Sequence, residues 1–342
     1  MPVPSIVQQQ MIAQLKELRV KKLTDDADVR RNLRDIVDTA SYRVEIYQRC
    51  LDEVLSRSAH SPEECTVVDY EGDYGLLSLL AKRLGFGKVI YLSASQEAIR
   101  VAQALAEQMG GGPDAVLQGG IDELRKWCDE RGMRPHALVS MNEIGHIYVL
   151  DPFFAAVHAL SPGITMLFTT VATPYNKHVV KRLRRTMQNQ EQGRRGKKGF
   201  LAQRRDFVQQ HYSDLPDHQL DYWASYTRGL CNDDILRAVE SQSPNLLQDP
   251  YNTCDPMTGR WCQRILPIDD YRHLLSPYGM RLEVLPGHCD EHVGWLRRWK
   301  SRRRNNTILK APLHEPTTRR ERRRMRKALK VAPFIYLIAE PK

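Results

Sequence analysis

The sequence predicts an α/β protein with a doubly wound, seven-stranded and mostly parallel sheet. Between residues 61 and 172, short apolar segments alternate with helical segments at intervals of about 25 residues. The apolar segments are continuous, which is typical of parallel strands that helices cover on both faces. Two further apolar segments, 281–285 and 334–339, are expected to complete the sheet as an antiparallel pair.

Helices are expected before this region. Apolar side chains recur at helical spacing between residues 5 and 57. Thr24, Asp25 and Asp26 form a polar cluster of the kind that begins a helix, and Ser61–Pro62 marks a boundary.

The first five predicted strands share short apolar runs that end in a polar side chain or a turn. In chain order they are 66–69, 89–92, 115–117, 137–140 and 164–169. The helices between them span 75–84, 96–109, 122–131 and 151–160. This alternation brings the carboxyl ends of the strands to one edge, where open α/β sheets bind ligands.

Four regions follow from this pattern. Residues 1–60 are N-terminal helices, and residues 61–172 form the sheet core. Residues 173–267 are a helical and loop insert expected to cover the ligand. Residues 268–342 return to the sheet and contain a basic insert at 295–330.

The net charge of +10 is concentrated in two segments. Trp295–Lys330 holds 15 Lys or Arg and two Glu, and Lys177–Arg205 holds 11 Lys or Arg and one Glu. The remainder is acidic, which excludes an evenly basic protein, and 42% hydrophobic residues exclude a disordered chain. The basic segments can bind RNA, lie on an anionic membrane, or pair with the acidic remainder.

A cytoplasmic protein is expected, either free or peripheral to a membrane. No apolar run approaches the ~18 residues of a membrane-spanning helix, and Met1–Gln10 lacks the features of a secretory signal. Seven cysteines at wide spacings fit reduced thiols better than a disulfide framework. No metal site is expected, because the Cys and His residues after position 250 form no Cys-x-x-Cys pair.

Four segments between residues 65 and 172 carry a family likeness. They are Val67–Asp69 leading to Gly75, the helix Leu76–Leu80, the loop Asn142–Ile147, and the turn Leu160–Gly163. Together they resemble the class I S-adenosylmethionine-dependent methyltransferases. The resemblance implies a Rossmann-like core, S-adenosylmethionine as the cofactor, and methyl transfer to an acceptor.

The resemblance also implies which residues bind the cofactor. They are Asp69, Glu71, Gly72 and Gly75 at the methionine end, Ser93 and Ala94 at the ribose, Gly120 and Ile121 at the adenine, and Asn142. Four positions depart from the family pattern: Glu71 and Asp73 replace two glycines, Ser93 replaces the ribose-binding acid, and Gly120 lies near the place of the adenine-side acid. Glu97 and Asp122 are nearby acids that can substitute.

His146 and Glu143, in the loop after the fourth strand, are the candidate catalytic residues. A histidine has a pKa suited to acid–base work, although a packing role is the alternative. The candidate substrate-binding residues are Tyr175, Asn176, Tyr222 and Arg228.

Two hypotheses of function remain at this point. The first is a class I methyltransferase with an unidentified acceptor. The second is a catalytically inactive scaffold of the same fold that binds RNA or a ribonucleoprotein, an anionic membrane, or an acidic protein through its basic inserts. An open cavity beside Gly75 and Ser93 favours the enzyme, whereas side chains of Glu71, Asp73 or Tyr74 filling that space favour the scaffold.

Overall fold

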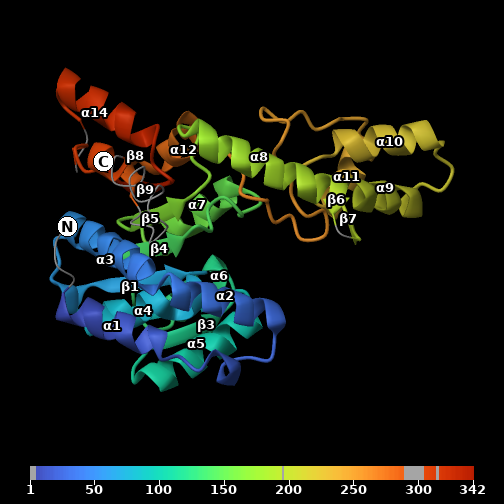
Figure 1. Ribbon diagram of the computed structural model, residues 1–342. Helices are drawn as coiled ribbons and strands as arrows, with labels where there is room; N and C mark the ends of the chain where they lie inside the picture. The colour runs from blue at the N-terminus through green and yellow to red at the C-terminus, as the bar shows by residue number, and fades with distance from the viewer. Residues whose placement is uncertain (1–4, 195, 289–303, 313–315) are drawn as a thin grey trace.

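A seven-stranded sheet forms the centre of the computed structural model, which describes residues 5–194, 196–288, 304–312 and 316–342 (Figure 1). The strands are β1 Thr66–Tyr70, β2 Lys88–Ser93, β3 Ala115–Gln118, β4 Ala137–Met141, β5 Thr165–Thr170, β8 Met280–Gly287 and β9 Phe334–Pro341. Their order across the sheet is β3-β2-β1-β4-β5-β9-β8. Strands β1 to β5 are parallel, and β9 runs antiparallel to β5 and β8. The predicted fold class is confirmed, including its antiparallel C-terminal pair.

Two groups of helices cover the sheet. The helices of the core and its N-terminal extension are α1 Ile6–Lys16, α2 Ala27–Asp38, α3 Ala40–Arg57, α4 Leu76–Arg83, α5 Gln96–Met109, α6 Ile121–Asp129, α7 Leu150–Leu160, α12 Ile268–Leu275 and α14 Arg319–Leu329. Helices α1, α3 and α4 contact one another, and α7 contacts both α6 and α12. Every residue of β5 is buried, so helices shield both faces of the central strands.

The N-terminal helices belong to the same hydrophobic core as the sheet. Met11, Leu15, Tyr47 and Leu51 are fully buried within that core. Asp26 begins α2, because its side chain accepts hydrogen bonds from the backbone N–H groups of the two residues after Ala27, each at 2.8 Å. The predicted helix start in the Thr24–Asp26 cluster is therefore confirmed.

Residues 177–240 form a helical arm that projects from the sheet (Figure 1, green to yellow). Its helices are α8 Lys177–Gln192, α9 Phe200–His211, α10 Asp217–Tyr226 and α11 Asn232–Glu240. It has a small core of its own around Val208 and Trp223. A short hairpin, β6 Gly193–Arg194 with β7 Lys197–Lys198, interrupts the arm, although the sequence predicts no strand there.

A buried ion pair fastens the arm to the chain that returns from it. The Arg204 side chain is fully buried, donates from Nε to the Ala224 carbonyl at 2.8 Å, and pairs with Glu191. Glu191 also accepts a hydrogen bond from Thr253 Oγ1 at 2.7 Å. Part of the basic segment Lys177–Arg205 is thus neutralised inside the protein.

Several sequence expectations concern features other than the sheet. Among the described residues, no helix has the length and apolar character needed to cross a membrane, and no three His, Cys, Asp or Glu side chains gather as a metal site. Six described cysteines are free thiols, while Cys289 lies outside the described residues. Residues 295–303 and 313–315 of the basic insert also lie outside them.

Candidate active site

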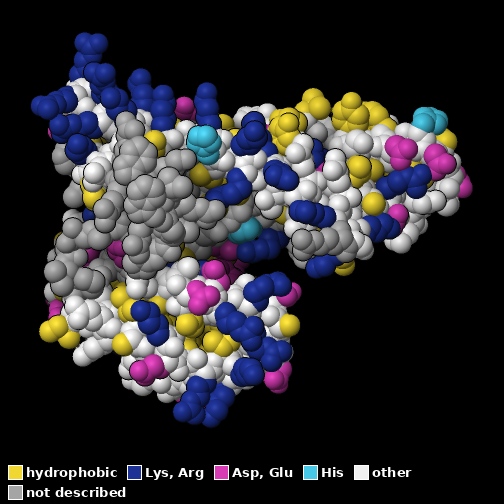
Figure 2. All heavy atoms as spheres, in the orientation of Figure 1, with side chains coloured by type: hydrophobic (Ala, Val, Ile, Leu, Met, Phe, Trp, Pro, Cys, Tyr) yellow, Lys and Arg dark blue, Asp and Glu magenta, His cyan; other side chains and the backbone are white. Residues whose placement is uncertain are grey.

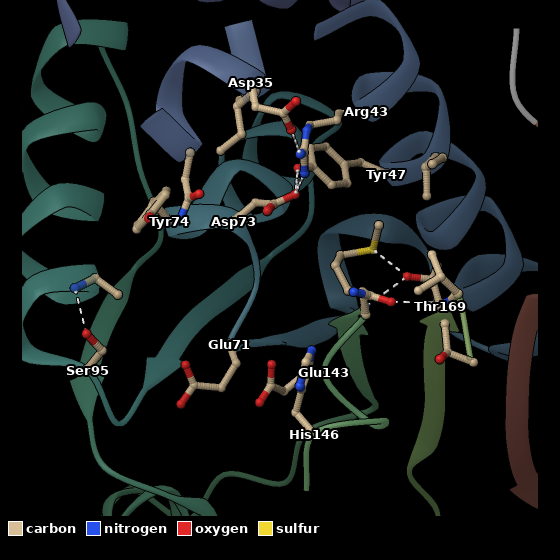
Figure 3. Close-up of a pocket in the computed structure, with 18 of the residues that line it drawn as sticks. Asp35, Arg43, Tyr47, Glu71, Asp73, Tyr74, Ser95, Glu143, His146 and Thr169 are labelled. Atoms are coloured by element: carbon tan, nitrogen blue, oxygen red, sulfur yellow. Dashed lines mark hydrogen bonds and ion pairs between the residues drawn. The ribbon is translucent and has the colours of Figure 1, made fainter. Parts of the chain in front are cut away.

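A cavity of about 750 Å³ lies at the carboxyl ends of β1, β2, β4 and β5 (Figure 3). Helices α2 and α3 line it from the N-terminal side. The strand order reverses between β1 and β4, so this edge is the place where an open α/β sheet binds ligands. The polar lining residues are Asn32, Asp35, Tyr42, Arg43, Tyr47, Glu71, Asp73, Tyr74, Tyr91, Ser95, Glu97, Asn142, Glu143, His146, Thr169, Thr170 and Arg260.

The loop after β1 has an unusual backbone. Glu71, Asp73, Tyr74 and Gly75 have φ angles of 54°, 21°, 58° and 77°. Glycine adopts this left-handed region readily, but each non-glycine residue there costs about 1–3 kcal/mol. Contacts from the surrounding structure must therefore hold the three side chains in place.

An ion-pair cluster from α3 holds Asp73. Its Oδ2 atom accepts hydrogen bonds from Arg43 Nη1 and Tyr47 Oη, each at 2.5 Å, and Arg43 also contacts Asp35 Oδ2 at 2.7 Å. Burial alone would lower the Arg43 pKa, but the attraction of Asp73 and the other partners raises it overall. Asp73 is thus turned toward the N-terminal helices (Figure 3), which leaves the cavity open.

Glu71 reaches across to the end of β2. Its Oε2 atom accepts a hydrogen bond from Ser93 Oγ at 2.6 Å, and its Oε1 atom accepts one from the Ala94 backbone N–H at 2.7 Å. Ser93 is fully buried, whereas Glu71 lines the cavity. A carboxylate from the β1 loop therefore stands beside Ser93, where the resemblance places an acid of β2.

Asp69 and Gly72 pack against each other and stabilise this loop. Asp69 is fully buried, and its Oδ2 atom accepts hydrogen bonds from the Ser78 backbone N–H and Oγ at 3.0 and 2.8 Å. Burial raises the Asp69 pKa to about 7. A Cβ atom at Gly72 would lie 2.1 Å from Asp69 Oδ1, so only glycine fits there. Gly75 begins α4.

Asn142 joins the ends of β4 and β5. Its backbone N–H donates to the Thr169 carbonyl at 3.0 Å, and its side-chain oxygen accepts from the Val171 N–H at 3.0 Å. The neighbouring Glu143 is largely buried and forms a two-pronged ion pair with Arg260, with Nη2–Oε2 at 2.8 Å. Burial raises the Glu143 pKa even though Arg260 opposes the shift.

His146 anchors the segment that returns from the arm. Its Nδ1 atom lies 2.6 Å from the Trp261 carbonyl oxygen, and its Nε2 atom lies 2.7 Å from Gln263 Nε2. A carbonyl only accepts, so Nδ1 carries the proton and Nε2 accepts from the glutamine amide. Burial, helped by Arg260, lowers the His146 pKa to about 4. Both ring nitrogens are engaged within the protein in this structure, and the acid–base role expected for His146 stays a prediction.

The remaining cofactor candidates differ in their places. Ser93 and Ala94 hold Glu71 and do not line the cavity. Gly120 and Ile121 begin α6, where the Gly120 N–H donates to Glu123 Oε2 at 2.8 Å. They also lie outside the cavity lining.

The four substrate candidates are not brought to the cavity. Asn176 begins α8, and its Nδ2 atom donates to the Ala332 carbonyl at 2.8 Å; Tyr175, just before it, is partly buried outside the lining. Tyr222 stands exposed on α10, because that helix buries Leu220 and Trp223 instead. Arg228 pairs with Glu191 inside the arm. These four residues therefore do not line the cavity, and their binding of a substrate stays a prediction.

The sequence reasoning also missed residues that line the cavity. Asp35, Arg43 and Tyr47 come from helices α2 and α3, and Arg260 comes from the return segment. The only sequence signal for these residues is that Arg43 and Tyr47 lie four residues apart, which places them on one face of α3. Nothing in the sequence ties that face to the β1 loop.

Comparisons with known proteins add the following. No family model matches the chain, and no curated protein matches it. Among solved structures, it is similar to geranyl diphosphate C-methyltransferase from Streptomyces coelicolor, with 9% identity, 99% of this chain and 100% of the other covered, and a TM-score of 0.41. The plantazolicin methyltransferase BpumL in complex with SAH shares 11% identity over 99% and 100% of the two chains, with a TM-score of 0.39.

A third neighbour matches a smaller part of this chain. The ribosomal protein L11 methylase from Lactobacillus delbrueckii subsp. bulgaricus shares 16% identity over 42% of this chain and 67% of its own, with a TM-score of 0.28. These neighbours are methyltransferases. The fold of this chain follows from its own strand pairing, and nothing about its ligands is concluded from these likenesses.

The fit of Gly72 against Asp69 can be tested by Gly72→Ala. The added Cβ overlaps Asp69 Oδ1, so we expect the free energy of unfolding to fall by about 1–3 kcal/mol. Gly111→Ala is the matched control, because nothing lies within 4 Å of its Cβ position. Urea denaturation of both variants checks this, and equal stabilities would contradict the packing described here.

The low pKa of His146 predicts a pH-dependent stability. Its folded-state pKa of about 4 lies below the ordinary value of 6.5, so only the unfolded chain binds this proton between those pH values. The free energy of unfolding should therefore decrease as the pH falls from 6.5 to 4, by on the order of 2–3 kcal/mol from this group. Denaturation midpoints of the wild type and His146→Asn over this range measure it. The variant should show a shallower decrease, and parallel profiles would exclude the effect.

Proposed function

We propose that the protein is an S-adenosylmethionine-dependent methyltransferase with a modified cofactor site. The observation that carries this proposal is the Glu71 carboxylate, which Ser93 and Ala94 hold at the carboxyl end of β2 beside the cavity. Compared with the family pattern, this chain lacks an acid at Ser93 and has an unexpected acid at Glu71. In the folded structure, the Glu71 carboxylate supplies the acid that is missing at Ser93.

The chemistry of Glu71 fits a ribose. A carboxylate has about four acceptor sites, and its two protein partners leave room for the two hydroxyls of a ribose. Hydrogen bonds to a charged acceptor are the stronger kind. The left-handed backbone at Glu71 and the buried Ser93 hydroxyl orient the carboxylate before any ligand arrives.

The charge and size of the cavity also support this ligand. Five carboxylates and two arginines line it, so the cavity favours a cationic ligand. S-adenosylmethionine carries a sulfonium cation, which supplies an activated methyl group when the cofactor is bound. The cavity volume of about 750 Å³ is within the usual range for ligand sites.

The residues of this chain would act mainly by positioning. Glu71 orients the nucleoside, while Arg43, Asp73 and Tyr47 fix the loop that faces its other end. His146 and Gln263 hold the return segment against the β4 loop, which keeps Arg260 at the cavity. Holding two reactants in the right geometry accounts for a large part of the rate acceleration in such a transfer.

The open cavity argues against the hypothesis of an inactive scaffold. The side chains expected to fill it under that hypothesis are Glu71, Asp73 and Tyr74. Asp73 turns toward α3, Glu71 bonds to the end of β2, and Tyr74 bonds to Asn32 on α2, so all three lie along the wall. The identity of the acceptor and a cytoplasmic location remain predictions.

Calorimetric titration with S-adenosylmethionine and S-adenosylhomocysteine tests the proposed function. We expect saturable binding of both at micromolar to submillimolar concentration. Absence of heat and of thermal stabilisation at millimolar ligand, with folded protein, would contradict the proposal.

An exchange of two residues tests the role of Glu71. Glu71→Gln should weaken binding of S-adenosylhomocysteine by about 10–100-fold, because it removes a charge-assisted hydrogen bond to ribose. Glu71→Gly alone and Ser93→Asp alone should also bind poorly, the first for lack of an acid and the second because two carboxylates repel. The double variant Glu71→Gly/Ser93→Asp should recover most of the affinity.

Glu107→Gln, an exposed change on α5, is the matched control and should bind as the wild type does. Calorimetry and circular dichroism on all five variants separate binding from folding. If the wild type binds but Glu71→Gln binds equally well, the role of Glu71 is wrong while the proposed function stands.

A further inference from the structure

The surface of α14 carries a dense and uncompensated positive charge. Its exposed cations are Arg319, Arg320, Arg322, Arg323, Arg324, Arg326 and Lys327, followed by Lys330 at its end. Figure 2 shows Lys and Arg side chains gathered over this helix and continuing along the same upper edge toward α8. Within the described ranges, none of these eight side chains forms an ion pair with a carboxylate.

The other basic segment is different. In Lys177–Arg205, Arg184 pairs with Asp249, Lys198 with Asp206, Arg204 with Glu191, and Arg205 with Asp217 and Asp221. Four of the eleven cations in that segment therefore pair with acids of the arm or of the chain that returns from it. For the cations of α14, the described part of the chain contains no such partner.

Folding alone would disfavour the sequence of α14. Cations stand four residues apart at several places, such as Arg319 with Arg323 and Arg320 with Arg324, and like charges at this spacing repel. Arg319, Arg320 and Arg322 also lie in the first turn, where the helix dipole favours acids. The one acid, Glu321, is taken up by the capping box, where it accepts from the Thr317 and Thr318 backbone N–H groups at 3.0 Å. An external polyanion would relieve both kinds of repulsion.

A helix that inserts into a membrane interface does not match this surface, and purely electrostatic attraction to anionic lipid is a competitor that the binding test includes. Helices that lie in a membrane interface insert an exposed apolar face between the lipids. The apolar residues of α14, Met325, Ala328 and Leu329, are all buried in the protein core. What α14 exposes is charge without an apolar or aromatic side chain, which suits a phosphate backbone and offers no platform for base stacking.

We propose that α14 is a docking surface for double-stranded RNA. One flank of the helix carries Arg322 and Arg326, and the opposite flank carries Arg320 and Arg324, given 100° per residue. Because α14 packs against β8 and its third side is buried, it presents only its outer face and its two charged flanks to a nucleic acid.

A-form RNA fits this constraint. Its major groove is narrow and deep, so proteins contact phosphates across it from outside, by shape rather than by base edges. Cations on both flanks of a helix that lies on the protein surface can reach the phosphates of both strands. This inference goes beyond the proposed function and does not depend on it, since RNA can dock with or without methyl transfer.

Fluorescence anisotropy with the full chain and a labelled 20-base-pair RNA duplex tests the proposal. The variant Arg320→Gln/Arg324→Gln/Lys327→Gln should bind at least ~10-fold more weakly, and the slope of log K against log salt should fall by about two to three. The control Arg100→Gln/Lys126→Gln/Arg131→Gln removes the same charge from α5, α6 and the following turn, and should change affinity less than ~2-fold. Urea denaturation and circular dichroism show that both variants are folded.

The competing ligands decide the identity of the partner. We expect weaker binding to a DNA duplex of the same sequence, to single-stranded RNA, and to vesicles containing 30% phosphatidylserine. Equal or tighter binding to DNA, single strands or vesicles would overturn the proposal. So would an unchanged affinity of the α14 variant, or no binding of duplex RNA at about 50 mM salt.

Discussion

The contact between the Glu71 carboxylate and the end of β2 is the constraint on which the cavity depends. It joins two neighbouring strands at the edge where the sheet order reverses, and it requires a left-handed backbone at Glu71. That backbone persists because the same loop is held on both sides. Arg43 and Tyr47 bind Asp73 from α3, and Asp69 fits against Gly72 from below. The strained loop is therefore preorganised for a ligand.

Acidic and basic side chains are concentrated in different parts of the structure. The cavity is acidic, which suits the proposed cationic cofactor, while the cations of α14, which form no ion pair within the described ranges, lie in another part of the molecule. The arm uses some of its cations internally, as the buried Arg204 and Glu191 pair illustrates. The net charge of +10 thus combines an acidic cavity, a partly neutralised arm and an exposed basic helix.

The sheet could be predicted from sequence because its signals are local. Continuous apolar runs mark β1 to β5, and the segment around Phe334 marks β9. The site could be predicted only in part. Glu71 and Ser93 each read as a defect in a motif, because 22 residues separate two side chains whose bond appears only when β1 and β2 pair. His146 was chosen by its residue type, and its two hydrogen-bond partners could not be predicted because they lie more than 100 residues away in the sequence.

We propose that a carboxylate from the β1 loop, Glu71, binds the ribose of the cofactor. The most direct measurement compares the affinity of the wild-type protein for S-adenosylhomocysteine and for its analogue that lacks both ribose hydroxyls. If Glu71 binds the ribose, the natural ligand binds at least ~10-fold more tightly, and Glu71→Gln abolishes the difference. Equal affinity of the wild type for the two ligands would contradict it.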